Sequence, residues 1–201
     1  PVLSQAASGI GSFSFPPAAD NIIRQMPLLA QADGALYPGL AVEALRVAQG
    51  VSGLQLRSSD ASGEHAGQQP GLLQLRVGQL DLPSQADASI RIHYSGMTHM
   101  PVIPAWQLLQ EDANAVSAVL EGRVVLIGTS AIGLRDIVAT PLAAAVPGVN
   151  VHAELVDQAL NGQYLLRPDW ARGAEVVLAL LAGLLLLLAM LPGRALPASL
   201  A

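Results

Sequence analysis

The spacing of apolar and polar residues changes several times along the chain, and each spacing predicts a different element. In residues 13–40, short apolar runs are separated by Pro-Pro, Asp-Asn and Asp33-Gly34 breaks, which predict short strands joined by tight turns. From Pro38 the apolar residues recur at helical spacing, and Gly50 follows as a stop. We therefore expect a helix over residues 38–49.

The next part of the chain alternates apolar and polar residues on either side of a polar segment. Residues 54–57 and 73–77 both alternate as half-buried strands do, and we expect them to pair as a hairpin. Residues 58–71 between them are polar, rich in glycine and without periodicity, which predicts an exposed loop. A further strand is expected over residues 90–94.

The second half of the chain predicts helices around one very apolar strand. Residues 105–122 carry one or two helical stretches that end at Gly122. The aliphatic run 123–127 is typical of a strand covered on both faces, so we expect it at the centre of the sheet. Helices alternating with strands predict an α/β fold, with mixed α+β as the alternative.

A helix expected over residues 149–160 should pack on that sheet. Its apolar stripe includes Val149, His152 and Val156, and Gly162 follows as a stop. We expect the opposite face, with Asn150, Glu154, Asp157 and Gln158, to be polar.

A long apolar segment near the C-terminal end predicts a membrane-spanning helix. Residues 174–191 contain Glu175 as their only charge, and Trp170–Leu191 reaches the roughly 20 residues that cross a bilayer. Asp169 is a suitable N-cap and Pro192-Gly193 a suitable end. We expect a water-soluble domain over 1–168, a transmembrane helix over 169–192 and the start of a loop over 193–201. A buried core helix is the alternative, but four successive turns here lack a polar face.

Composition and charge agree with this division. The chain is 52% hydrophobic and only 12% charged, about half the usual charged share, as a membrane segment would cause. The net charge is −5 and the positive charges are scattered arginines without a basic patch, so we expect no nucleic-acid binding. The lack of cysteine excludes disulfides and thiolate chemistry within the chain. Because the chain begins at Pro1, we expect it to be part of a longer protein.

Several spaced motifs resemble one known family. They are Val125–Asp136, Thr140-Pro141, Pro147–Val149, Val151–Ala153 and Leu160–Gly162 with Arg167-Pro168, preceded by Asp20–Arg24, Pro27-Leu28 and Tyr37-Pro38. Together they resemble the second class of CHASE domains, the "cyclases/histidine kinases associated sensory extracellular" modules, over most of residues 13–168. Asn21 and Gly39 depart from the pattern, because many members have Gly and Ser there.

The resemblance implies a bacterial signalling receptor. Members lie outside the cytoplasmic membrane and feed cytoplasmic adenylate or diguanylate cyclase, histidine kinase or serine/threonine kinase domains. It therefore implies a periplasmic sensory domain anchored in the inner membrane, without catalysis of its own. It also implies a homodimer, because class III cyclases work as dimers. The identity of a small ligand or envelope partner and the type of output domain stay open.

A second hypothesis is a membrane-anchored docking module that binds another envelope protein. A large apolar pocket beside Gly128–Asp136 would favour the sensor, whereas a flat exposed apolar patch would favour docking.

The candidate ligand site lies around the segment after the expected central strand. A segment at that position would occupy the carboxyl edge of the sheet, where open α/β folds bind ligands. The candidate ligand-binding residues are Gly128, Thr129, Ser130, Asp136, Thr140 and His152. A tight turn whose side chains bond main-chain amides is the alternative. Leu134-Arg135 stand where a P-loop needs Lys and Ser/Thr, and Ser130 replaces a glycine of the dinucleotide fingerprint.

No catalytic or metal site is expected. Ser130, Asp136 and His152 follow the order of an α/β-hydrolase triad, but Ile132 stands where the nucleophile elbow needs glycine. A histidine on a packing stripe is more often buried and hydrogen-bonded than a catalytic base. The other histidines, His65, His93 and His99, lack the spacing of metal ligands, and no cofactor is predicted.

Overall fold

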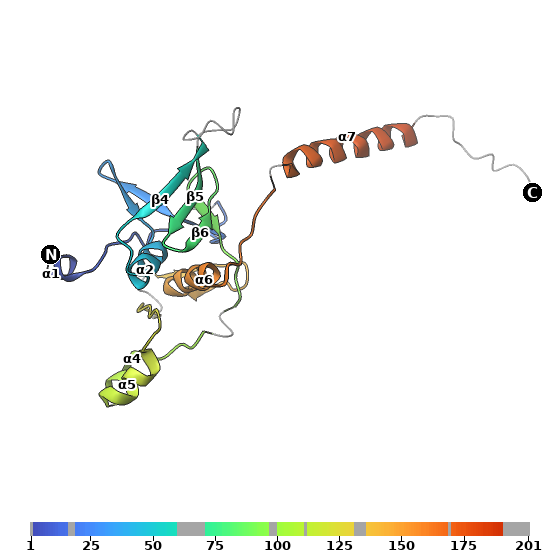
Figure 1. The fold of residues 1–201 in the computed structure, drawn as a ribbon. Coiled ribbons are helices and arrows are strands. Elements are labelled where there is room, and N and C mark those ends of the chain that lie inside the picture. The colour runs from blue at the N-terminus through green and yellow to red at the C-terminus, as the bar shows by residue number, and fades with distance from the viewer. Residues whose placement is uncertain are drawn as a thin grey trace, which may run out of the picture. The chain divides into compact units, whose positions relative to one another are not determined.

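The computed structural model describes residues 2–15, 19–59, 71–96, 100–110, 112–130, 136–168 and 170–190. The chain divides into two compact units, Pro1–Leu165 and Leu166–Ala201. The elements of the first unit, shown in Figure 1, are α1 (Val2–Ala6), β1 (Gln25–Pro27), β2 (Leu29–Ala32), β3 (Ala35–Pro38), α2 (Leu40–Ala48), β4 (Leu54–Ser58), β5 (Leu72–Val77), β6 (Leu80–Pro83), β7 (Ser89–Arg91), α4 (Ala105–Gln110), α5 (Ala113–Leu120), β8 (Ile137–Val138), β9 (Val146–Pro147) and α6 (Gly148–Asn161). The second unit contains α7 (Ala171–Met190).

The largest sheet of the first unit has three antiparallel strands in the order β4-β5-β6. Leu54 lies opposite Val77, which in turn lies opposite Leu80. Strand alternation places Leu75, Val77 and Leu82 on the covered face, where all three are fully buried. The predicted hairpin is confirmed, whereas most of its connecting loop, residues 60–70, lies outside the described residues.

The remaining strands form two-stranded antiparallel pairs, β1 with β7, β2 with β3, and β8 with β9. The β2–β3 hairpin turns at Asp33 and Gly34, whose φ values of 50° and 76° are those of a two-residue turn compatible with strand twist. This confirms the turn predicted at Asp33-Gly34. The strand expected over 90–94 is shorter, because β7 ends at Arg91.

The core lies between the sheet and two helices. Helix α2 contributes Ala41, Val42 and Leu45, and helix α6 contributes Val151 and Leu155, all nearly or fully buried. The two helices contact each other and the sheet, and lie beneath it in the view of Figure 1. Both helices predicted over 38–49 and 149–160 are therefore confirmed. Helix α6 ends at Gly162, whose φ of 65° is the left-handed conformation of a helix C-cap.

The buried central strand predicted at 123–127 is wrong. Residues 124–130 adopt no strand, and Val124, Val125 and Ile127 are exposed, Ile127 to 91%. A strand needs a neighbouring strand for its backbone hydrogen bonds. In the described part of the chain the strands pair with one another in antiparallel fashion, and none of them pairs with residues 124–130. The prediction of mixed α and β structure is confirmed, but as several small antiparallel sheets.

Two short helices precede this run, as the sequence predicts for residues 105–122. Helix α4 has no buried residue. Helix α5 begins at a regular N-cap, because the Asp112 carboxylate accepts hydrogen bonds from Asn114 N and Ala115 N at 3.0 and 2.8 Å.

The second unit is a 20-residue helix, α7, with the residues that lead into it. Its leucines and valines are exposed over their whole run, for example Leu178 at 65%. Arg167 pairs with Glu175, so the charges flanking the start of the helix are neutralised. Within the part of the chain that is described, no helix combines the length and apolarity that a membrane crossing requires. The predicted cap at Asp169 and the predicted end at Pro192-Gly193 lie outside the described residues.

Candidate functional site

The segment predicted to bind a ligand is exposed at its start. Gly128, Thr129 and Ser130 end the exposed apolar run, and residues 131–135 lie outside the described residues. The Thr129 hydroxyl donates to the Asp136 carboxylate at 3.4 Å, which links the two ends of the segment. Because the preceding residues form no strand, this segment does not follow a sheet edge as expected.

The same segment meets the first turn of α6. Gly148 N donates to the main-chain oxygen of Asp136 at 2.6 Å. A β-carbon at Gly148 would collide with the Asp136 carboxylate, and one at Gly128 would collide with the Val149 side chain. Glycine is therefore required for this close approach, which places the Asp136 carboxylate near the positive end of the helix.

His152 lies on the buried side of α6, one turn after Gly148. Its side chain is 2% exposed, and its ring lies 5.3 Å from that of Phe15, centroid to centroid. Neither imidazole nitrogen has a hydrogen-bond partner in the described part of the chain. The prediction of burial is confirmed, but the expected hydrogen bonds are missing. Buried polar groups are normally paired, so an imidazole without such a partner is unusual at this position.

Burial lowers the pKa of His152, against smaller opposing effects from the Phe13 main chain and the charge of Asp136. When folding lowers the pKa of a histidine, the unfolded chain takes up a proton at a higher pH than the folded chain does. The folded state therefore loses stability as the pH falls below the unfolded pKa. The domain should therefore lose stability as the pH falls below about 6.5, the unfolded pKa of histidine.

The pH dependence is measured by urea denaturation at pH 7.5 and pH 5, with His152→Phe as the comparison. The variant keeps a planar ring beside Phe15 but cannot be protonated. We expect the free energy of unfolding of His152→Phe, relative to that of the natural chain, to increase from pH 7.5 to pH 5. A difference that is the same at both pH values would contradict a buried, neutral imidazole.

Thr140 forms a hydrogen-bonded turn with Ala143. It is 7% exposed, its N–H donates to Ala143 O at 2.8 Å, and its hydroxyl accepts from Ala143 N at 3.1 Å. The Thr140 hydroxyl and main chain are thus both used within this turn.

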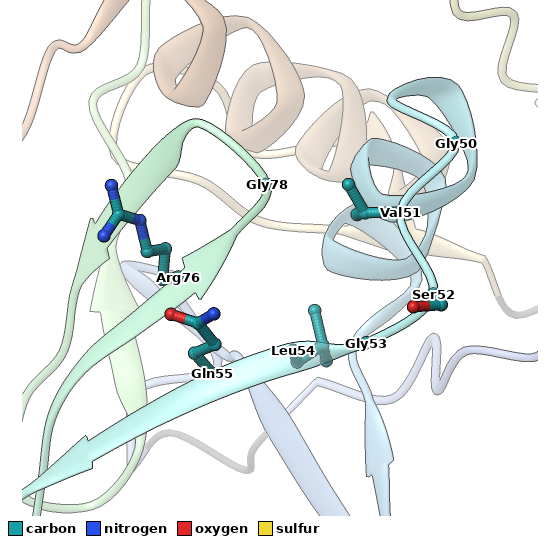
Figure 2. Close-up of a pocket in the computed structure, with 8 residues that line it drawn as sticks. All are labelled: Gly50, Val51, Ser52, Gly53, Leu54, Gln55, Arg76 and Gly78. Carbon is teal, nitrogen blue, oxygen red and sulfur yellow. The ribbon is translucent and has the colours of Figure 1, made fainter.

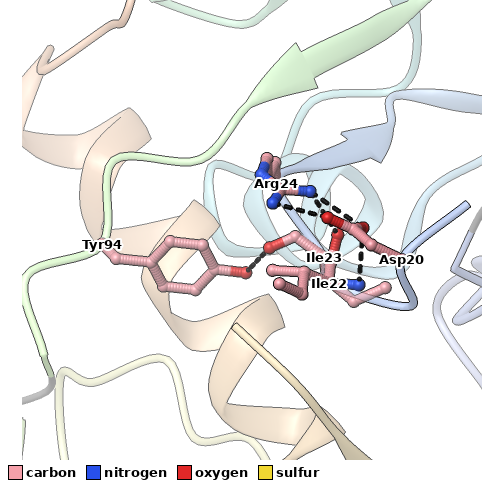
Figure 3. A network of polar contacts seen from close by, with 5 residues as sticks. All are labelled: Asp20, Ile22, Ile23, Arg24 and Tyr94. Carbon is pink, nitrogen blue, oxygen red and sulfur yellow. Dashed lines mark hydrogen bonds and ion pairs between the residues drawn. The ribbon is translucent and has the colours of Figure 1, made fainter. Parts of the chain in front are cut away.

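The upstream motif Asp20–Arg24 forms a network of polar contacts, which Figure 3 shows together with Tyr94. Asp20 accepts from Ile22 N at 3.1 Å and pairs with both terminal nitrogens of Arg24. The Arg24 guanidinium, aided by the Ile22 amide, lowers the pKa of Asp20 to about 2. Ile23 N donates to Ala139 O at 2.8 Å. This hydrogen bond attaches the turn to the segment that runs from Asp136 to Thr140.

The conformation of Asn21 and a hydrogen bond from Tyr94 explain the shape of that turn. Asn21, at the position where many CHASE domains of this class have glycine, adopts φ 56°, a conformation that asparagine tolerates better than most residues. The Tyr94 hydroxyl donates to Ile23 O at 2.9 Å, and burial raises the pKa of this tyrosine. The Asp20–Arg24 pair is about half exposed, so its main effect is to close the turn rather than to stabilise the domain.

The expected polar face of α6 is wrong at two positions. Glu154 and Gln158 are 2% and 1% exposed. Glu154 accepts from Ser95 N, the Ser95 hydroxyl and Gly96 N at 2.8–3.1 Å, while Gln158 accepts from His93 N at 2.7 Å and donates to Arg91 O at 3.0 Å.

These two side chains replace a missing strand partner. Ile92 N donates to Arg24 O next to β1, while Arg91 O, His93 N, Ser95 N and Gly96 N bond to the side chains of Gln158 and Glu154 on α6. The signal in the sequence was their spacing, because Val151, Glu154, Leu155 and Gln158 lie three or four positions apart and so share one face of the helix.

Comparison with known families identifies the chain. The CHASE2 domain model matches residues 1–189, so the chain belongs to the CHASE2 family, a family of sensory extracellular domains found in signalling receptors. The resemblance deduced from the spaced motifs is thereby confirmed. No curated protein and no solved structure matches the chain significantly.

Proposed function

We propose that the chain is the extracytoplasmic input domain of a bacterial transmembrane receptor, which passes a ligand or partner signal to a cytoplasmic cyclase or kinase. The observation that carries the proposal is the match of the CHASE2 model over residues 1–189.

The proposed mechanism is a shift between two arrangements of the domain. A ligand that binds one arrangement better than the other changes their populations by its difference in affinity. Helix α6 would report the change, because it carries both His152 and the two side chains that hold residues 91–96. The helix ends at Asn161, and residues 162–170 connect it directly to α7.

We propose that α7, extended to Leu191, crosses the membrane. A helix over Trp170–Leu191 is about 33 Å long, comparable with the hydrocarbon core of a bilayer. Apolar residues on every face of the helix, without a polar stripe, support a lipid environment. A homodimer is the proposed signalling state, in keeping with dimeric cyclase outputs.

The test is to insert one to four alanines within Gln163–Arg167 of the full-length receptor and measure its output activity. Residues 163–167 are not helical, so each inserted alanine lengthens the connection between α6 and α7 by up to about 3.5 Å. We expect at least one insertion to change the output about fivefold or more, as allosteric couplings do.

The same insertions between Asp33 and Gly34, at the tip of the β2–β3 hairpin, are the control. Unchanged output with every insertion in the connecting segment, in a receptor of normal abundance, would refute coupling through α6 and α7.

A docking module is the second candidate, and the exposed apolar run 124–127 favours it. Regulation of the purified receptor in vesicles by a small molecule alone would support the sensor. Regulation that needs an added envelope protein, and that Ile127→Asp removes without loss of stability, would support docking.

A further inference from the structure

A pocket of about 470 Å³ opens between the loop after α2 and the β4–β5 hairpin (Figure 2). It is lined by Gly50, Val51, Ser52, Gly53, Leu54, Gln55, Arg76 and Gly78. This volume lies within the range of small-molecule sites. None of the lining residues belongs to the segment 128–136, so the pocket is a separate site.

The polar wall of the pocket is one row of cross-strand neighbours. Gln55 lies opposite Arg76, and Arg76 lies opposite Asp81, so these side chains share the outer face of the sheet. Figure 2 shows Gln55 and Arg76 rising from the two neighbouring strands. Arg76 is the only charged residue among those that line the pocket.

The guanidinium of Arg76 is available for a second partner. Its Nε atom lies 3.3 Å from Asp81 Oδ1, and both side chains are about half exposed, so this pair is weak. The terminal nitrogens of Arg76 make no hydrogen bond within the described part of the chain. A guanidinium presents its donors as a planar fork that matches a carboxylate in a bidentate pair.

The opposite wall is apolar and held in place. Val51 and Leu54 are partly buried against the core. Arg46 donates to Val51 O at 2.7 Å, while the Gln49 amide donates to Val77 O and accepts from Gln79 N at 3.1 and 3.0 Å. Both rims of the pocket are thus tied to the end of α2, and the site is formed before any ligand arrives.

We propose that this pocket binds a small organic acid, with its carboxylate on Arg76 and Gln55 and its apolar part against Val51. The proposal deepens the sensory function and rests on it for its biological meaning. A bound acid would contact the loop that directly follows α2, and α2 packs against α6. The pocket would therefore be coupled to the helix that leads towards α7.

The test uses the 201-residue chain in detergent and follows its amide NMR signals during titration with butyrate, succinate and butyramide. Butyramide has nearly the shape of butyrate but no charge. We expect saturable shifts at Gly50–Gln55 and Arg76 with at least one of the acids and none with butyramide. Arg76→Gln should weaken binding about tenfold or more, whereas Arg91→Gln, at the exposed end of β7, should leave it unchanged.

Failure of both acids to give saturable shifts, equal binding of butyramide, or undiminished binding to Arg76→Gln would overturn the proposal. Binding as expected that leaves the output of the full-length receptor unchanged would uphold the pocket and count against the sensory function instead.

Discussion

Replacing Leu155 by alanine is expected to lower the free energy of unfolding by about 2–5 kcal/mol, the usual cost of a leucine truncated in a close-packed core. Leu155 is 0% exposed and lies on α6, the helix that faces the fully buried Leu75 and Leu82 of the sheet within one core cluster. The loss combines the transfer free energy of the removed methyl groups with the cavity that remains.

The matched control is Leu160→Ala on the same helix, where the leucine is 58% exposed. It should change stability by no more than about 0.5 kcal/mol. Urea denaturation followed by circular dichroism measures both. Equal effects of the two substitutions would show that α6 does not bury the face assigned to it.

Gln158→Leu is expected to cost about 2–4 kcal/mol, although leucine is apolar and of similar size. The substitution removes the partners of His93 N–H and Arg91 C=O, and the side chain that supplied them is 1% exposed. Two main-chain groups would lose their hydrogen bonds in a place where water reaches them poorly. A hydrophobic replacement here therefore destabilises the domain, contrary to a simple transfer argument.

Hydrogen exchange at the His93 amide gives the site-specific measurement. We expect the exchange of this amide to accelerate in Gln158→Leu and to stay unchanged in Asn161→Leu, at an exposed position of the same helix. An unchanged His93 amide would mean that Gln158 does not hold residues 91–93 to α6.

The parts of the fold that the sequence predicts are those with local signals. The α2 and α6 helices follow from apolar spacing with Gly50 and Gly162 as stops, and the β2–β3 turn follows from Asp33-Gly34. The β4–β5 hairpin follows from strict alternation. Each of these signals acts between residues close in the sequence.

The errors arise where the environment is set by distant residues. The run 123–127 has the composition of a buried strand, but only neighbouring strands could bury it, and the sequence does not show which strands pair. Glu154 and Gln158 are polar, and the periodicity places them opposite the apolar stripe of the helix. They are buried because residues 91–96, about sixty positions earlier, need hydrogen-bond partners.

The ligand-binding role of the candidate residues stays a prediction, and their arrangement differs from the one expected. His152 and Asp136 do lie near the start of α6, but the sheet edge that was expected to present them does not exist. The Arg76 pocket had no motif at all, because it depends on the register that places Gln55 opposite Arg76.

The location of the domain is the central claim, and labelling a single cysteine tests it most directly. The chain has no cysteine, so Gln31→Cys, at an exposed position of β2, adds a unique thiol to a full-length receptor otherwise freed of cysteine. A membrane-impermeant maleimide should label this residue in intact cells as fully as after lysis. Labelling that appears only once the cytoplasmic membrane is broken would place the domain in the cytoplasm and contradict the account.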